Sequence, residues 1–227
     1  MSTKNSKNYS NESVKEYYHS TGLYDSIIYK KNKTNQNLSK EEIIESLLLK
    51  NKKLSNKVTG TNKKIILSNK NYKSKIMVLG DMPSQKDIDN NELFSDDSGE
   101  LLTKMLGAIS IDSSQVYLAN IIPFYLTKEE GKNIKKYNSL LRKIVHEHIS
   151  AINPETILLL GSFALQTLFG EEYSIAKNRG QWLSYSAANN SINIIPSFHP
   201  TFLIKQPSQK KKSWEDLQEL QKKLNNA

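Results

Sequence analysis

The sequence has no cysteine among its 227 residues. It therefore cannot form a disulfide, offers no thiolate nucleophile, and has no ligands for a cysteine-bound zinc or iron–sulfur centre. Histidine is also scarce, with four residues, so we expect neither a metal nor another cofactor. No apolar run approaches the roughly 20 residues that a membrane span requires, and residues 1–37 lack the apolar core of a signal peptide. We therefore expect a cytoplasmic protein that makes no contact with a membrane.

Basic residues outnumber acidic ones. The sequence has 32 Lys and Arg residues against 23 Asp and Glu residues, which gives a net charge of +9 at pH 7. This excess favours a polyanionic partner, because lysines that neutralise phosphates gain affinity by releasing condensed counterions. The alternative is that the many Lys and Asn residues reflect a compositional bias of the source genome.

The first third of the sequence differs in composition from the rest. Residues 1–72 are rich in Lys, Asn and Ser and have few apolar residues, apart from two segments of helical character at 13–28 and 39–49. Ser39 and Glu42 have the spacing of a capping box at the start of the second segment. We expect residues 1–72 to form an N-terminal extension with one or two helices, and residues 73–227 to form an α/β domain.

Short apolar runs alternate with segments of helical periodicity after residue 73. The runs IMVL, VYLANII, TILLL and INII are bounded by Gly, Pro, Asn or Asp, as expected for strands that are buried on both faces. They occupy residues 76–79, 116–122, 156–160 and 192–195, and the helical segments occupy residues 99–109, 129–152, 162–169 and 209–224. This alternation predicts a three-layer α/β/α fold with a central, mostly parallel, four-stranded sheet.

Polar and aromatic residues follow three of the expected strands. The first strand runs into GDMPS at residues 80–84 and on to Phe94, the second ends at Asn120, and the last leads to His199. Because ligands bind at the carboxyl ends of the strands in such sheets, we expect these residues to meet. Together they can hold a planar heterocycle, with Phe94 stacking on the ring, Asn120 forming paired hydrogen bonds and His199 stabilising charge at a ring oxygen. Taken one at a time, they have simpler explanations: a turn or cap Asn, a core Phe and a structural His.

The order and spacing of these segments resemble the uracil-DNA glycosylase superfamily, and most closely its family-4 type. GDMPSQKD with the later LF and SG, within residues 80–99, aligns without a gap with the family's first motif, which reads GEAPGxxE followed by PF and GxxG. AN at residues 119–120 is similar to the TN of the second motif. HPTFLIKQPSQKKKSWEDL at residues 199–217 resembles HPSxLLRxPxxKRxxWxDL and is the most specific part. The resemblance covers about residues 73–224.

The resemblance implies a monofunctional DNA repair glycosylase that flips uracil out of DNA and hydrolyses its N-glycosidic bond, with other deaminated bases as further candidate substrates. Nothing in the sequence suggests an oligomer, so we expect a monomer. It implies that Phe94 stacks on the uracil, that Asn120 reads its polar edge and that His199 stabilises the negative charge on the leaving base. Asp81 stands where the family has a glutamate, and a carboxylate there orients water or favours a cationic sugar.

The resemblance also implies two further sets of contacts. Gly80 and Met82 belong to the loop expected to bind the base. The residues expected to contact DNA are Ser84, Pro200, Thr201, Lys205, Lys210, Lys211 and Lys212.

Several residues depart from the family pattern. Asp81 is one methylene shorter than the glutamate, and Asp96 and Asp97 lie in a segment that reads FSDDSG here and FVGxAG in the family. These two carboxylates would repel a DNA phosphate unless they point away from it. Two of the positions at which family 4 has cluster-binding cysteines hold Phe124 and Leu141, whose apolar contacts can replace the packing of the cluster.

These departures leave two alternatives to an active uracil-DNA glycosylase. One is a catalytically weakened or inactive homologue that binds DNA or a partner protein through the same basic surface. The other is an enzyme of the same fold that acts on another base or on a free nucleoside.

Overall fold

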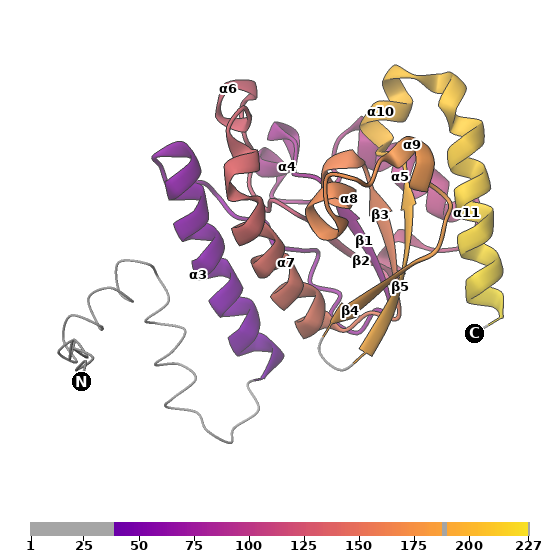
Figure 1. Cartoon of the computed structure of the whole chain (residues 1–227), viewed down its shortest axis with the longest axis horizontal. Helices are drawn as coiled ribbons and strands as arrows, with labels where there is room; N and C mark the ends of the chain where they lie inside the picture. The colour runs from indigo at the N-terminus through magenta and orange to yellow at the C-terminus, as the bar shows by residue number, and fades with distance from the viewer. Residues whose placement is uncertain (1–38, 188–189, 227) are drawn as a thin grey trace, which may run out of the picture. The chain divides into compact units, whose positions relative to one another are not determined.

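A five-stranded sheet forms the centre of the computed structural model, which describes residues 39–187 and 190–226 (Figure 1). The strand order is β2-β1-β3-β5-β4, with β4 antiparallel to β5 at one edge and the other pairs parallel. The strands are Ile76–Gly80 (β1), Tyr117–Asn120 (β2), Thr156–Leu160 (β3), Leu183–Ala187 (β4) and Asn190–Ser197 (β5). The helix predicted at residues 13–28 lies outside the described residues.

The sheet confirms the mostly parallel α/β prediction, but the predicted number of four strands is wrong. The four apolar runs form β1, β2, β3 and β5, and the missed strand is β4, with the sequence LSYSA. Ser184 and Ser186 are exposed and alternate with partly or fully buried neighbours. Because β4 is an edge strand that faces solvent on one side, it lacks the continuous apolar run that marks a strand buried on both faces.

Alternate residues of the strands enter two separate cores, one on each face of the sheet. Met77 and Leu79 belong to one core, whereas Val78 between them belongs to the other. The helices over the first core are α3 (Lys40–Thr59), α7 (Asn138–Ile152) and α8 (Ser162–Phe169) (Figure 1). The helices over the second core are α5 (Asp97–Gly107), α10 (Pro200–Lys205) and α11 (Lys210–Asn225). The predicted three-layer arrangement is therefore confirmed.

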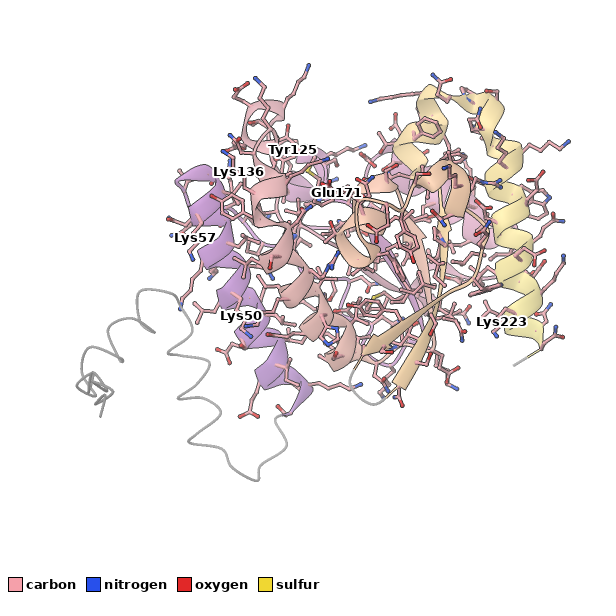
Figure 2. All side chains as sticks on the ribbon, viewed as in Figure 1. Lys50, Lys57, Tyr125, Lys136, Glu171 and Lys223 are labelled. Atoms are coloured by element: carbon pink, nitrogen blue, oxygen red, sulfur yellow. The ribbon has the colours of Figure 1, made fainter. Side chains whose placement is uncertain are left out.

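The helix predicted at residues 39–49 is the first half of α3, which continues to Thr59. Leu47 and Leu54 are buried in the same core as α7. Lys50 forms an ion pair with Glu147 of α7, and Figure 2 shows its side chain on the α3 ribbon beside that helix. Helix α3 is thus packed against the sheet domain through both apolar and charged contacts.

The long helix predicted at residues 129–152 is interrupted. It consists of α6 (Lys128–Gly131), a 3-10 turn (Ile134–Tyr137) and α7. Gly131 ends α6, and glycine is a poor residue for a helix interior. The remaining short helices are α4 (Gln85–Asn90) and α9 (Ile175–Asn178). In the described part of the chain no helix has the length and apolar character needed to cross a membrane.

Phe124 and Leu141 both lie in the core under α3 and α7. Each has 0% of its surface exposed, and both belong to one continuous apolar cluster. Burial of a side chain of this size contributes about 1.5–3 kcal/mol of stability. Apolar packing therefore fills the space around the two positions at which the resemblance places cluster-binding cysteines.

Candidate active site

Three side chains from different loops converge on the backbone of Gly80. Gly80 ends β1 and is paired with Asn120 at the end of β2. A Cβ atom placed on Gly80 would lie 2.5 Å from Asn120 Oδ1, 3.0 Å from Phe94 Cζ and 3.4 Å from His199 Nε2. A side chain at residue 80 would therefore fill the space between these three groups, and the glycine keeps it open.

Asn120 presents a buried carbonyl oxygen to this space. The residue is 3% exposed, and its Oδ1 has no hydrogen-bond partner among the described residues. An unpaired buried acceptor costs about 1–3 kcal/mol, so its presence in a folded protein calls for an explanation such as a ligand. The oxygen is positioned to accept a hydrogen bond from a group that enters the space beside Gly80.

His199 presents a hydrogen-bond donor to the same space. It precedes α10, and its Nδ1 accepts a hydrogen bond from the backbone N–H of Thr201 at 3.2 Å. Loss of hydration lowers the pKa of His199 to about 4, although the carboxylates of Asp96 and Asp87 partly oppose this shift. The imidazole is therefore neutral at pH 7 and carries its proton on Nε2, a buried atom with no partner in the described part of the chain.

The ring of Phe94 lies against His199. The two ring centroids are 6.2 Å apart and the ring planes are inclined by 27°. The backbone φ of Phe94 is +57°, in the left-handed region that aromatic residues rarely adopt. Gly99 of α5 packs directly against this backbone, because a Cβ on Gly99 would lie 1.6 Å from the Phe94 carbonyl oxygen.

Asp81 lies at the start of α8. Its Oδ1 accepts a hydrogen bond from the backbone N–H of Ala164 at 2.8 Å. A Cβ on Gly161, which precedes α8 with φ of +102°, would lie 2.7 Å from Asp81 Oδ2. Loss of hydration raises the pKa of Asp81 to about 6, against the lowering effect of the Ala164 N–H. Asp81 is thus mostly ionised at neutral pH, and the N-terminus of α8 stabilises its negative charge. Its neighbour Met82 is 41% exposed.

The two additional carboxylates of the first motif point to different environments. Asp96 caps α5, where its Oδ1 accepts hydrogen bonds from the backbone N–H groups of Ser98 at 3.0 Å and Gly99 at 3.3 Å. Partial burial opposes ionisation of Asp96, but these bonds and that of the Ser98 hydroxyl lower its pKa. Asp97, in contrast, is exposed. The charge of Asp96 is therefore partly neutralised by its own helix.

The residues predicted to contact DNA lie at the starts of α4, α10 and α11, except Lys205, which is the last residue of α10. Ser84 caps α4, Pro200 is the buried first residue of α10, and Thr201 and Lys205 are exposed on α10. Lys210, Lys211 and Lys212 are exposed in the first turn of α11. Cations in the first turn of a helix oppose its dipole, so a bound anion would relieve an unfavourable arrangement.

A buried ionic network fixes α11 against the end of β5. The Asp216 carboxylate is 1% exposed and accepts hydrogen bonds from Ser197 Oγ at 2.6 Å and Arg179 Nε at 3.2 Å. Arg179 also donates to the backbone carbonyl of Lys212. The sequence interpretation missed this network, and its only local signals were Arg179 in RGQW and Asp216 in WEDL.

The sequence interpretation also missed Asp87, a buried carboxylate on α4. Its spacing from Ser84 is the S-x-x-D pattern of a capping box, which the structure contains. This pattern was one available signal, and the other was the place of Asp87 at the second glutamate of the motif GEAPGxxE. Within residues 39–187 and 190–226, there is no group of three or more His, Cys, Asp or Glu residues that could hold a metal ion.

Comparison with a family model and with individual proteins indicates the same family. Residues 68–218 match the model of the uracil DNA glycosylase superfamily. The type-4 uracil-DNA glycosylase of Thermotoga maritima is 27% identical over 149 residues, which cover 63% of this chain and 73% of that protein. The type-4 uracil-DNA glycosylase of Archaeoglobus fulgidus is 25% identical over 141 residues, which cover 60% of this chain and 70% of that protein. That of Saccharolobus solfataricus is 25% identical over 163 residues, covering 68% and 73% respectively.

Proposed function

The chain belongs to the uracil-DNA glycosylase superfamily and resembles its type-4 members, and from this premise we propose that it hydrolyses the N-glycosidic bond of uracil in DNA. The observation that carries the proposal is the pair of unpartnered buried atoms, Asn120 Oδ1 and His199 Nε2, on either side of the space left by Gly80. One is an acceptor and the other a donor.

Uracil has the complementary groups on a flat ring. Its N3–H donates to an acceptor such as Asn120 Oδ1, and its carbonyl oxygens accept from a donor such as His199 Nε2–H. Cytosine has an acceptor at N3, which would face Asn120 Oδ1 without a hydrogen bond, so the same arrangement discriminates against cytosine. Stacking of the base on Phe94 contributes about 1–3 kcal/mol, which partly offsets the cost of flipping it out of the duplex.

His199 acts mainly in the transition state. Water adds to C1′ of the deoxyribose while the bond from C1′ to N1 of uracil breaks, and the electron pair of that bond leaves with the base. The products are free uracil and an abasic site. The developing uracil anion places negative charge on the ring oxygens, so the N–H of a neutral His199 binds it more strongly than it binds the intact nucleotide. A full proton transfer from His199 is not required.

Asp81 supplies negative charge near the site. A carboxylate there favours a cationic sugar or orients the attacking water. Its pKa of about 6 keeps it mostly ionised at neutral pH, as this role requires. Gly80 and Met82 belong to the same loop as Asp81 and are assigned to base binding.

DNA binding is assigned to the loop at Ser84, to exposed residues of α10 and the buried Pro200 at its start, and to the start of α11. Pro200, Thr201 and Lys205 lie next to His199 in sequence, and the three lysines of α11 face the phosphate backbone in this proposal. The monomeric state, the cytoplasmic location and the division at residue 72 remain predictions.

Incubation with a uracil-containing oligonucleotide, followed by alkali, tests the proposal. We expect strand cleavage at the uracil, and parallel reactions with hypoxanthine and xanthine define the range of bases. A gel shift without cleavage would contradict the proposal and favour the inactive DNA-binding homologue. Release of a base from a free nucleoside, with no action on DNA, would favour the other alternative, an enzyme of the same fold that acts on a nucleoside.

Lys211→Ala tests the DNA surface against a matched control on the same helix. Each phosphate contact contributes a slope of about −0.9 to the dependence of log K on log salt concentration, so Lys211→Ala should reduce the slope by about 1. The control is Lys223→Ala at the opposite end of α11 (Figure 2). Equal loss of slope in both variants would show a general charge effect and would remove Lys211 from the interface.

A further inference from the structure

The segment between β1 and α5 holds Phe94 in an unfavourable backbone conformation. A positive φ for an aromatic residue persists only where surrounding contacts over-determine it. The Phe94 ring lies against His199, so the contacts that fix the Phe94 backbone also fix the position of this ring beside His199. The question is which side chain provides them.

Asp87 connects both ends of this segment. The residue is 4% exposed, and its Oδ2 accepts a hydrogen bond from the backbone N–H of Ser84 at 2.8 Å. Its Oδ1 accepts from the backbone N–H of Ser95 at 2.7 Å and from Ser95 Oγ at 3.0 Å. The backbone carbonyl of Asp87 also accepts from Glu92 N–H at 3.0 Å. Ser95 directly follows Phe94, so one buried carboxylate determines where the backbone leaves the aromatic residue.

Gly99 restrains Phe94 from the other side. The lack of a side chain on Gly99 lets α5 touch the Phe94 carbonyl group. The N-terminus of α5 is in turn fixed by the Asp96 cap. Phe94 is therefore held between the carboxylate of Asp87 and the backbone of α5.

We propose that Asp87 is a positioning residue that holds the Phe94 ring against His199 and so aligns the surface on which the base stacks. The proposal rests on the proposed function, because base stacking is the role assigned to Phe94. Asp87 itself touches neither base nor sugar in this proposal. Its hydrogen bonds act on the substrate through Ser95 and the Phe94 backbone, whereas its charge acts directly on the pKa of His199.

Asp87→Asn is the informative substitution. Asparagine has nearly the same size, but its amide group has one acceptor oxygen and one donor nitrogen. The nitrogen would face a backbone N–H of either Ser84 or Ser95, so one end of the connection is lost. The control is Asp89→Asn, which removes the same charge from an exposed position on the same short helix.

Kinetics on a uracil-containing oligonucleotide provide the first measurement. Stacking acts on the bound base in both the ground state and the transition state, so Asp87→Asn should raise KM about tenfold and change kcat less than about threefold. Phe94→Ala should raise KM in the same way, and the double variant should be no worse than Phe94→Ala. Effects of Asp87→Asn and Phe94→Ala that multiply in the double variant would overturn the proposal.

An NMR measurement tests the same point without catalysis. The chain has four histidines, and the ring proton of His199 can be assigned by its loss in His199→Gln. Phe94→Ala should shift this proton, because the ring current of the nearby phenyl group is removed. Asp87→Asn should shift it in the same direction, and Asp89→Asn should leave it unchanged. An unmoved signal in folded Asp87→Asn would overturn the proposal.

Failure of the proposed function and failure of Asp87→Asn to fold can each be distinguished from failure of the Asp87 proposal. If the wild-type protein releases no uracil, the proposed function fails, while the His199 signal still decides the role of Asp87. If Asp87→Asn does not fold, Ser95→Ala removes only the hydroxyl contact and keeps the carboxylate. We then expect a smaller shift of the His199 signal in the same direction, and no shift would overturn the proposal.

Discussion

His148 and His199 are both imidazoles that the fold has withdrawn from water, but they differ in their partners. Burial lowers the pKa of His148 to about 4, and loss of hydration lowers that of His199 to the same value. His148, on α7, has its Nε2 2.7 Å from the hydroxyl of Tyr117 on β2. His199 Nε2 has no partner among the described residues.

The difference separates a structural histidine from one that is available to a ligand. The Tyr117 contact satisfies His148 inside the core, far from any solvent contact, since both residues are at most 3% exposed. His199 leaves a strong donor unpaired beside an equally unpaired acceptor on Asn120. Burial lowers the pKa of both residues to about 4, so they differ only in whether Nε2 has a hydrogen-bond partner.

Removing the unpaired histidine should have the largest effect on activity. We expect His199→Ala to reduce kcat about 10²–10³-fold, because the variant lacks the donor that stabilises the leaving base. Affinity for DNA that contains an abasic analogue should change by less than about threefold, because the phosphate contacts remain. Single-turnover kinetics and a binding titration measure the two quantities. Turnover equal to that of the wild type would place His199 outside the mechanism and remove the contrast with His148.

Removing the paired histidine should instead change stability. His148→Phe leaves the Tyr117 hydroxyl without its imidazole partner, which should lower the free energy of unfolding by about 1–3 kcal/mol at pH 7. The kcat of the folded variant should stay within about twofold of the wild type. Denaturant unfolding and the glycosylase assay test both expectations.

The pH dependence of the free energy of unfolding provides a second test of the role of His148. The pKa of His148 is about 4 in the folded protein against about 6.5 in an unfolded chain, so unfolding takes up a proton between these values. Its contribution to stability is complete above pH 6.5 and is lost as the pH falls towards 4. Between pH 7 and 4.5 the wild type should therefore lose about 2 kcal/mol more than His148→Phe. Equal losses in the two proteins would contradict the assigned burial of a neutral His148.

Ser197 provides the smallest and closest comparison, because it is two residues from His199 on the same chain segment. Its hydroxyl belongs to the satisfied network with Asp216 and Arg179. Ser197→Ala should lower the free energy of unfolding by about 1 kcal/mol and leave kcat within about twofold of the wild type. A loss of activity as large as that of His199→Ala would show that the Asp216 network takes part in the reaction.

The sequence predicted those parts of the fold that depend on burial from both faces. The runs at β1, β2, β3 and β5 are continuous and apolar, so their positions and the sheet type followed directly. The strand-end rule also directed attention to Phe94, Asn120 and His199, which the structure brings together around Gly80. These residues could be predicted because Asn120 ends a strand and Phe94 and His199 lie in the segments that leave two other strands.

Other features depend on contacts between distant residues and could not be read from local patterns. The edge strand β4 lacks a continuous apolar run. Asp81 turns to the N-terminus of α8, more than 80 residues away, and Asp87 bonds to a serine eight residues along the chain. Side-chain direction decides both cases, and a sequence pattern does not specify it.

The direct contact between Gly99 and the Phe94 carbonyl joins the two ends of a short segment whose sequence departs from the family pattern. The two residues that touch, Phe94 and Gly99, are those the chain shares with the pattern FVGxAG, whereas the positions between them have changed. The Ser95 hydroxyl donates a hydrogen bond to Asp87, and Asp96 Oδ1 accepts one from the backbone N–H of Ser98, so both side chains stabilise the turn. Any substitution of Gly99 would have to displace the Phe94 backbone, since even an alanine methyl would overlap the neighbouring carbonyl.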